Sequence, residues 1–401
     1  MERRNLVHRE TQSQLDSLVV ALEGNRLTRR EFLQRGATLG LTASLLADIV
    51  AQCCLAVAAE TPPPEVVKKI AKEGKRLFIY NWEDYLHPRI IAAFEREFGV
   101  KVTYDTFPSN EHLLAKLQAG GARYDVVFPT HNFLQIYIAQ GLLAPLNHDH
   151  IPLLSHLLPR FRHNPVDPGN TYGVPYSWGT TALAHNARDT KDDPHLGSWA
   201  LLFDSGPQRY SGKLGMTDER EEVIAAALQY LGYNPNSRDA NQLRQAGAVL
   251  QRLKPHIKAF YPGVEIRKAL ITEDLVVAHS WSGETVKAQQ SNATVAWSLP
   301  KEGATGWFDV MAIPKVAPHK FTAEVFINYM LRPEVAADNA ATTGYAIANQ
   351  VALERYIAPN VARNPAIYPP DDLLARVTFL EVIPDELLPV YEEIWLRILA
   401  G

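Results

Sequence analysis

Short apolar runs and amphipathic helical patterns alternate along the chain from about residue 75, and this alternation restricts the fold more than any other feature. The run Leu77–Tyr80 is typical of a buried strand. A helix is expected next, from Pro88 to a stop at Gly99. Further strands are expected at 100–104 and 124–128, each followed by a helical pattern. Such βαβ units predict a mainly parallel sheet covered by helices.

The alternation resumes near Gly173 and forms a second α/β block. No internal repeat and no low-complexity linker separates the blocks, so the chain is expected to cross between two α/β lobes several times. A cleft between two such lobes is a common place for a small-molecule site. The expected elements of the second block are an apolar run at 201–203, helices at 221–231 and 240–252, a run at 275–279, a strand at 294–299 and a helix at 323–331.

Composition narrows the functional classes. The chain has 401 residues, of which 46% are hydrophobic, so it can bury one large or two medium cores. Its 40 basic and 44 acidic residues give no basic excess, so a nucleic-acid partner is not expected. After residue 54 there is no cysteine and no uncharged apolar stretch of the about twenty residues that a membrane span needs.

The N-terminal residues 1–58 have the organisation of an export leader. Arg29 and Arg30 precede a weakly apolar run at 36–50, and Ala56–Ala59 contains an A-x-A cleavage pattern. The arginine pair indicates the twin-arginine type of leader, which implies the twin-arginine translocase as a partner. Two alternatives remain open: an amphipathic helix or uncleaved membrane anchor, and a lipid anchor at Cys53, for which Gln52 is a poor preceding residue.

Common sequence motifs for catalysis, cofactor binding and metal binding are absent from this sequence. It has no G-x-S-x-G, no G-x-x-x-x-G-K-[ST] and no G-x-G-x-x-G after a strand. His148-Asp149-His150 is the densest group of potential metal ligands, but its prolines indicate a surface loop and no further spaced ligands support a site. Neither a cofactor nor a metal is expected. An active site made of carboxylates alone stays open.

Acids stand at four places, at three of them beside an aromatic residue, and each place is interpreted as lying next to the end of a strand. In open α/β sheets ligands bind at that edge. Each place also has an ordinary interpretation, because acids favour a first helical turn and a single Trp is usually core. The four groups are Trp82 to Tyr85, Glu219 with Glu222, Trp281 with Glu284, and Trp307 with Asp309.

Together these groups indicate a site for a small organic cation. Carboxylates would neutralise ammonium groups through charge-assisted hydrogen bonds. Trp and Tyr rings would cover the methylene groups and attract the ammonium groups. A cation would then favour closure of the cleft by reducing repulsion between the acids.

From about Leu77 to the C-terminus the chain resembles the periplasmic spermidine/putrescine-binding proteins of polyamine ABC transporters. The resemblance is carried by Y-N-W-E-D-Y, T-F-P-S-N-E, Y-D-V-V-F-P-T, V-P-Y-S-W-G-T-T, L-P-K-E-G-A-x-G-W-F-D-V-M-A-I-P, N-Y-M-L-R-P-E-V-A and N-P-A-I-Y-P-P. It implies a two-lobed type II periplasmic-binding fold of class α/β. The expected division is an extension at 59–74, lobe 1 at 75–179 plus 310–353, and lobe 2 at 180–309 plus 354–401.

The resemblance also implies the ligand-binding residues. In four places the sequence departs from one branch of the family or combines features of two, and one of them is Glu381, where spermidine-type members have a glutamine by a looser alignment. Asn132 replaces a tyrosine of spermidine-type members, Glu219 matches the spermidine type, and Glu284 matches the putrescine type. The expected ligand-binding set is Trp82, Asp84, Tyr85, Thr130, Glu219, Glu222, Trp281, Glu284, Trp307, Asp309, Tyr345 and Glu381.

The sequence therefore predicts a monomeric periplasmic receptor, without enzymatic activity, that passes a polyamine to the permease of an ABC transporter. The alternatives are a receptor for another small organic cation, a secreted enzyme with a carboxylate pair, and a sensor that presents the polyamine to a signalling partner. The choice between spermidine, putrescine and another amine stays open.

Overall fold

The structure is a computed structural model of the whole chain, which describes residues 61–120, 123–262 and 264–400 together with Leu18, Phe32 and residues 35–37. Most of the predicted leader, including the arginine pair and Cys53, lies outside the described residues. The chain forms two compact units, Met1–Lys75 with Pro88–Val100, and Arg76–His87 with Lys101–Gly401.

In the first unit, two helices are described, α4 (Pro64–Lys72) and α5 (Pro88–Phe98). Helix α5 confirms the predicted helix. It begins at a proline, whose missing N–H has no role in a first helical turn, and it ends before Gly99 in the left-handed conformation at φ 65°. Phe94 and Phe98 are buried, and their ring centroids lie 4.7 Å apart.

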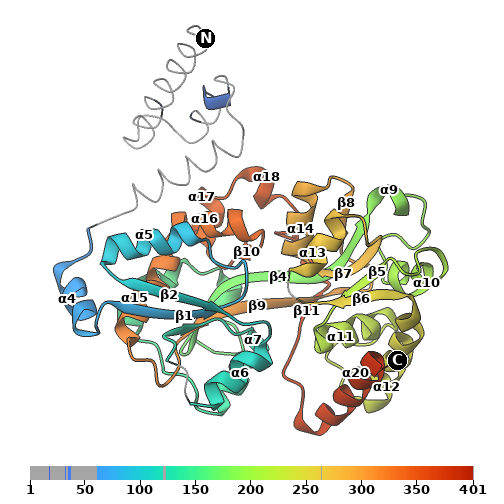
Figure 1. Cartoon of the computed structure of the whole chain (residues 1–401), viewed down its shortest axis with the longest axis horizontal. Helices are drawn as coiled ribbons and strands as arrows, with labels where there is room; N and C mark the ends of the chain where they lie inside the picture. Colours follow the sequence, from blue (N-terminus) through green and yellow to red (C-terminus); the bar gives the residue numbers. More distant parts are fainter. Residues whose placement is uncertain are drawn as a thin grey trace. The chain divides into compact units, whose positions relative to one another are not determined.

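In the second unit, eleven strands of the described residues form one mixed sheet (Figure 1). The main order is β2-β1-β3-β9-β4-β7-β5-β6, and β8, β10 and β11 pair with β4 or β9 beside this path. The strands are β1 Arg76–Asn81, β2 Lys101–Thr106, β3 Val126–Val127, β4 Gly173–Asn186, β5 Leu214–Thr217, β6 Ile257–Tyr261, β7 Val277–Trp281, β8 Val295–Ser298, β9 Ala304–Ala312, β10 Ala346–Ile347 and β11 Val377–Phe379.

Both ends of the main strand order are parallel, as predicted, whereas its middle is antiparallel. Strand β1 pairs in parallel with β2 and β3, and β5 pairs in parallel with β6 and β7. The long strands β4 and β9 pair antiparallel with each other, and they also pair antiparallel with β7 and β3 respectively. All fourteen residues of β4 are buried, so this strand has no polar face from which sequence periodicity could identify it.

Helices cover both faces of this sheet, and the predicted ones form with shifted ends. Ser109 caps α6 as predicted, accepting a hydrogen bond from the His112 backbone N–H at 3.4 Å. The run at 201–203 belongs to a helical turn, Leu201–Ser205. The helices of this unit are α6 Asn110–Gln118, α7 His131–Ala139, α8 Pro159–Arg162, α9 Ala187–Thr190, α10 Gly206–Arg209, α11 Arg220–Tyr230, α12 Ala240–Leu253, α13 Glu265–Ile271, α14 Ser282–Ser291, α15 Lys320–Met330, α16 Pro333–Thr343, α17 Gln350–Arg355, α18 Pro359–Ala362, α19 Asp371–Leu374 and α20 Leu388–Ala400.

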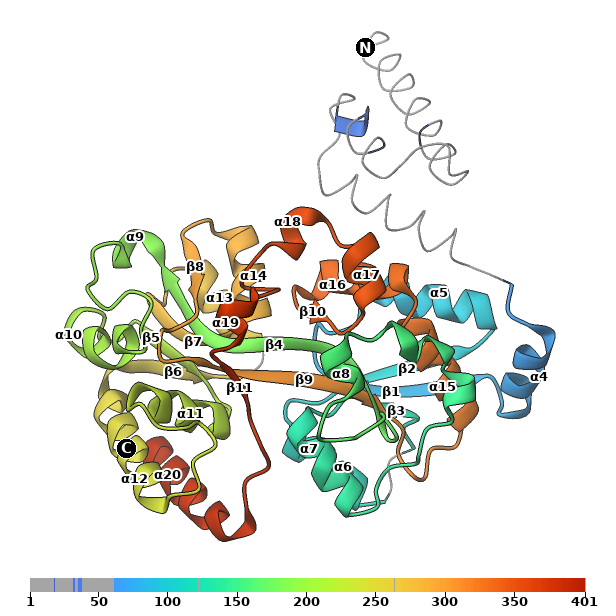
Figure 2. The same cartoon turned by 180° about the vertical axis from the view of Figure 1, so that it is seen from behind.

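Around β5 to β7 the helices form two layers. Figures 1 and 2 show α11, α12 and α20 on one face and α13 and α14 on the other. A large apolar cluster fills the first interface and includes Leu214, Leu228, Leu250 and Ile394. Among the described residues, no helix combines the length and the apolar character that a membrane crossing requires.

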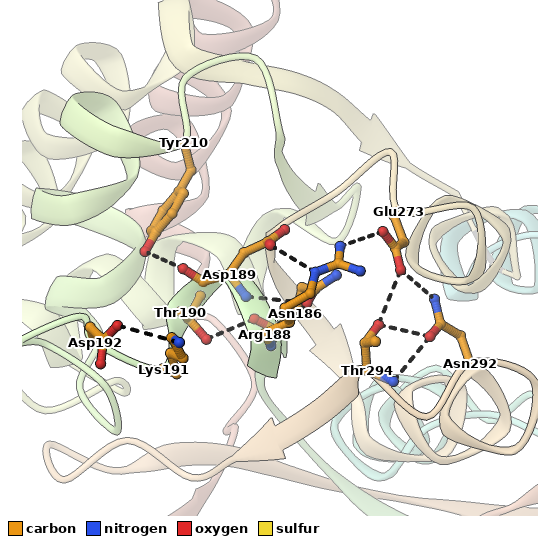
Figure 3. A network of polar contacts seen from close by, with 10 residues as sticks. All are labelled: Asn186, Arg188, Asp189, Thr190, Lys191, Asp192, Tyr210, Glu273, Asn292 and Thr294. Atoms are coloured by element: carbon orange, nitrogen blue, oxygen red, sulfur yellow. Dashed lines mark hydrogen bonds and ion pairs between the residues drawn. The ribbon is translucent and has the colours of Figure 1, made fainter.

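Polar contacts fasten the outer edge of this region (Figure 3). Arg188 of α9 donates a hydrogen bond to Asp189 at 3.1 Å and another to Glu273, which follows α13, at 2.6 Å. Glu273 also accepts from Asn292 and Thr294, each at 3.4 Å. The network joins segments from α9, α13 and the turn before β8, but the side chains of Arg188 and Glu273 are too exposed for large electrostatic stabilisation.

Asp125, just before β3, links two strands to a helix. Its fully buried carboxylate accepts from the Phe78 backbone N–H and the His319 backbone N–H, both at 2.8 Å. Replacing Asp125 with Ala leaves both donors buried and unpaired. We expect Asp125→Ala to lower the free energy of unfolding by about 3 kcal/mol, measured by urea titration.

The exposed Asp149 provides the matched control. Asp149→Ala should change the free energy of unfolding by less than about 0.5 kcal/mol. Equal effects of the two substitutions would contradict the role given to Asp125.

Candidate functional site

A cleft of about 450 Å³ lies within the second unit and is lined by residues from widely separated parts of its sequence. Ten of the twelve predicted ligand-binding residues line it: Trp82, Tyr85, Thr130, Glu219, Glu222, Trp281, Glu284, Trp307, Asp309 and Tyr345. The cleft therefore brings together the loop after β1, the starts of α7, α11 and α14, strand β9 and the segment before β10.

Aromatic rings form much of the cleft wall. Trp82 is oriented by a hydrogen bond from its indole N–H to the Phe128 carbonyl at 2.9 Å. The rings of Trp307 and Tyr345 pack edge to face with centroids 5.2 Å apart, and Tyr345 contacts Tyr85 in the same way at 5.6 Å. Such rings give a ligand an apolar surface with electron-rich faces.

Trp307 and Asp309 lie within β9, so the expectation that they flank the end of a strand is wrong. They are two residues apart in an extended strand and therefore point to the same face. Gly179 on β4 pairs with Trp307, and a Cβ atom there would come within 2.7 Å of the indole ring. The glycine leaves the space that the indole occupies.

Asp309 is a buried carboxyl group with a neutral partner. It accepts a hydrogen bond from the Tyr85 hydroxyl at 2.6 Å, and its backbone forms an isolated bridge with Thr130. Burial raises the pKa of Asp309 to about 7, although the hydrogen bonds from Tyr85 and Thr130 act in the opposite direction.

Glu222 is held in a similar way in the first turn of α11. Its carboxyl oxygens accept from the Thr181 hydroxyl at 2.8 Å and from the Trp281 indole N–H at 2.9 Å. Burial raises its pKa to about 7. Glu219, at the N-cap of the same helix, also has a raised pKa, first through desolvation and then through the charge of Glu222.

Glu284 differs from these acids because basic side chains accompany it. Lys287 Nζ lies 3.3 Å from its Oε1 and Arg267 Nη1 lies 3.5 Å from its Oε2. Arg267 also donates to Asp84 at 2.8 Å. This hydrogen bond lowers the pKa of Asp84.

Two predicted ligand-binding residues do not line the cleft. The Asp84 side chain is half exposed and paired with Arg267, and its backbone has a left-handed φ of 54°. Glu381 is exposed and lies 3.3 Å from Arg238, whereas its neighbour Leu380 lines the cleft. Their part in ligand binding stays a prediction.

Several lining residues were not singled out from the sequence. Phe107 follows β2, and its ring centroid lies 4.5 Å from that of Trp82. It could have been found from the sequence because it also lies at the end of a strand. Val264, the N-cap of α13, and Glu265, its first residue, carried no comparable signal. Asn132, noted as a departure, lines the cleft, and its buried Oδ1 accepts no hydrogen bond from the described residues.

Within the described part of the chain, no group of three or more His, Cys, Asp and Glu side chains could hold a metal ion. His148 and His150 lie in a short 3₁₀ turn. His148 Nε2 is 2.9 Å from the Asn170 carbonyl oxygen, and His150 Nδ1 is 2.6 Å from Glu324 Oε2. Each histidine therefore contacts a polar group of another segment of the protein.

Comparison with known proteins gives the class to which this fold and cleft belong. Residues 89–369 match the model of the bacterial extracellular solute-binding proteins. The chain is a member of this family. Its two-lobed α/β fold is that of the periplasmic solute-binding proteins, as the sequence predicted.

Curated relatives cover nearly the whole chain. The putrescine-binding periplasmic protein PotF of Escherichia coli K12 is 35% identical over 374 residues, which is 89% of this chain and 98% of PotF. The spermidine/putrescine-binding periplasmic protein of the same strain is 32% identical over 341 residues, covering 82% of this chain and 93% of the relative.

Solved structures give the same relationship. PotD, a spermidine/putrescine ABC transporter substrate-binding protein from Streptococcus pneumoniae, superposes with a TM-score of 0.71 at 31% identity, covering 82% of this chain and 99% of PotD. The PotD lipoprotein of Treponema pallidum also gives a TM-score of 0.71, at 26% identity, covering 80% of this chain and 99% of that protein.

The raised pKa of Glu222 can be observed through Trp281. As pH rises from 5.5 to 8.5, Glu222 passes from protonated to ionised around pH 7, and the hydrogen bond from the Trp281 indole becomes charge-assisted. We therefore expect the Trp281 component of the fluorescence, obtained by subtracting a Trp281→Phe variant, to change around pH 7. The transition should vanish in Glu222→Gln. Its persistence in that variant would show that another group causes it.

Proposed function

We propose that the chain binds a polyamine outside the cytoplasmic membrane and delivers it to the permease of an ABC transporter. One observation carries this proposal: among the acids that line an aromatic cleft, Glu219, Glu222 and Asp309 are shielded from water and form no ion pair with any described residue. A buried carboxylate without a cation is costly, and a bound ammonium group would remove that cost.

The cleft also fits the other parts of an aliphatic amine. Trp and Tyr rings can cover methylene groups and attract ammonium groups through their faces. The free Oδ1 of Asn132 can accept a hydrogen bond from an ammonium N–H. PotF and the E. coli spermidine/putrescine-binding protein, by their names, bind such amines.

The binding cycle follows from these charges. With the cleft open, water solvates the acids and the carboxyl groups repel one another. A polyamine brings positive charge between them, so closure becomes favourable only with ligand present. The proposed lobes, 75–179 plus 310–353 and 180–309 plus 354–401, both contribute lining residues, and the closed receptor would be the form that meets the permease.

The proposed receptor is monomeric and has no enzymatic role. A secreted carboxylate enzyme is the second candidate, because Glu222 and Asp309 both have a pKa of about 7, as a general acid and base would need. Chemical change of a bound amine would favour it. Receptors for another organic cation and polyamine sensors share the same cleft chemistry.

The main test is binding of putrescine, spermidine and cadaverine by titration calorimetry at pH 8, above the pKa of about 7 of Glu222 and Asp309. At least one amine should bind, and Asp309→Asn should weaken that binding by more than about tenfold, the effect of losing a charge-assisted hydrogen bond. The control is Asp192→Asn, whose side chain is exposed. No binding of any amine by the unaltered protein would refute the polyamine proposal.

Export forms a separate part of the proposal. Residues 1–58 would direct the chain to the twin-arginine translocase and place it in the periplasm, with lipid anchoring at Cys53 as the alternative. Replacing both Arg29 and Arg30 with Lys should retain the protein in the cytoplasm with its leader uncleaved, as cell fractionation would show. Unchanged periplasmic yield would exclude the twin-arginine route.

A further inference from the structure

One end of the cleft contains an acid that the protein itself neutralises. Glu284 lines the cleft, and its side chain is only 4% exposed. Lys287 follows Glu284 by about one turn of α14, so its Nζ lies 3.3 Å from Glu284 Oε1. The side chain of Lys287 is itself only 11% exposed. Arg267 of α13 approaches Oε2 at 3.5 Å. Neither basic residue lines the cleft, so both act from behind Glu284.

The packing of α13 against α14 maintains this arrangement. Lys287 Nζ also lies 5.8 Å from the centre of the Tyr345 ring, and the Tyr345 hydroxyl donates to Glu284 at 3.4 Å. Arg267 is tied to Asp84 in the loop after β1. Because Asp84 and Glu284 balance Arg267 and Lys287, the charges of this group cancel.

The remaining acids of the cleft are in a different electrostatic state. Glu222 and Asp309 accept hydrogen bonds from neutral groups only, and Glu219 forms no ion pair with any described residue. Glu221 is paired with Arg220 at 2.8 Å, and Glu265 with Lys268 at 2.6 Å. Glu83 also lines the cleft without an ion pair to a described residue, but its side chain is exposed to water. The shielded negative charge available to a ligand is therefore concentrated at Glu219, Glu222 and Asp309.

We propose that Arg267 and Lys287 determine ligand specificity by neutralising Glu284, so that the cleft discriminates against amines that need a further carboxylate there. This inference rests on the proposed function, since it assumes that the ligand is an aliphatic amine. The preferred ligand places its cationic groups at Glu219, Glu222 and Asp309, and an uncharged part of it meets Glu284.

The contacts of Glu284 show how substitution of Lys287 or Arg267 would make the Glu284 carboxylate available to a ligand. Its Oε2 accepts no hydrogen bond from the described residues, so the Arg267 contact is an ion pair without a directed bond. With Lys287 or Arg267 absent, the carboxylate keeps one basic neighbour and gains capacity for a ligand ammonium group. Each residue acts on the ligand through Glu284 and is therefore a positioning residue.

The experiment compares three linear amines that carry one, two and three charges at pH 8, where amines with a pKa of about 10.4 are protonated: 4-amino-1-butanol, putrescine and spermidine. Calorimetry gives their affinities for the unaltered protein, Lys287→Gln and Arg267→Gln. We expect the ratio of spermidine to 4-amino-1-butanol affinity to rise by at least about tenfold in each variant.

Three controls separate this effect from a general loss of positive charge. Lys191→Gln removes an exposed charge whose partner, Asp192, does not line the cleft, and should change the ratio by less than about threefold. Adding Glu284→Gln to Lys287→Gln should abolish the gain, and Lys287→Arg should preserve the original ratio.

The outcomes distinguish the two proposals. If the unaltered protein binds none of the amines, the proposed function fails and this inference fails with it. If it binds amines but Lys287→Gln and Arg267→Gln leave the ratio unchanged, or if Lys191→Gln changes it equally, only the role given to Arg267 and Lys287 is refuted.

Discussion

The antiparallel pairing of β4 with β9 is the constraint on which both the sheet and the cleft depend. Strand β9 pairs with β3 and so joins the parallel group of β1 to β3. Strand β4 pairs with β7 and so joins the parallel group of β5 to β7. The same pairing sets Trp307 opposite Gly179 and Asp309 opposite Ser177. A register shift of one residue would turn both site residues to the other face of the sheet. The position of the cleft chemistry thus follows from backbone hydrogen bonds between segments more than a hundred residues apart in the chain.

Within this frame, two acids of the cleft, Glu222 and Asp309, are held by neutral hydrogen-bond donors and have raised pKa values. The Tyr85 hydroxyl holds Asp309, and the Trp281 indole and Thr181 hydroxyl hold Glu222. These hydrogen bonds fix the orientation of the carboxyl groups but supply no positive charge, so burial still raises both pKa values to about 7. A cation bound beside them would favour the ionised forms. Binding of a cation would consequently be coupled to proton release around neutral pH. The aromatic residues Tyr85 and Trp281, which line the cleft, also hold two of its acids in place.

Local patterns in the sequence were sufficient for the elements whose signals are local. The proline and glycine around α5 and the Ser109 cap of α6 were predicted because first-turn and last-turn chemistry is set by neighbouring residues. Strand β4 has no alternating polar face, so periodicity could not define it. The strand predicted at 124–128 is confirmed, but only the two residues of β3 are paired. Trp307 and Asp309 were assigned to the cleft although their strand was not recognised. The family motif identifies the two residues by their spacing and contains no information on their secondary structure.

The charge state of each acid could not be predicted, because it depends on partners brought by distant segments. Glu222 and Glu284 both stand in the first turn of a helix after a strand, and both were predicted from the sequence to bind the ligand. In the structure one is held by a hydroxyl and an indole, whereas the other has Lys287 one turn away and Arg267 from a different helix. Counting acids in a motif therefore overestimates the negative charge offered to a ligand. The combination of spermidine-type and putrescine-type acids is less anionic than its sequence indicates, since the putrescine-type Glu284 is already compensated from behind.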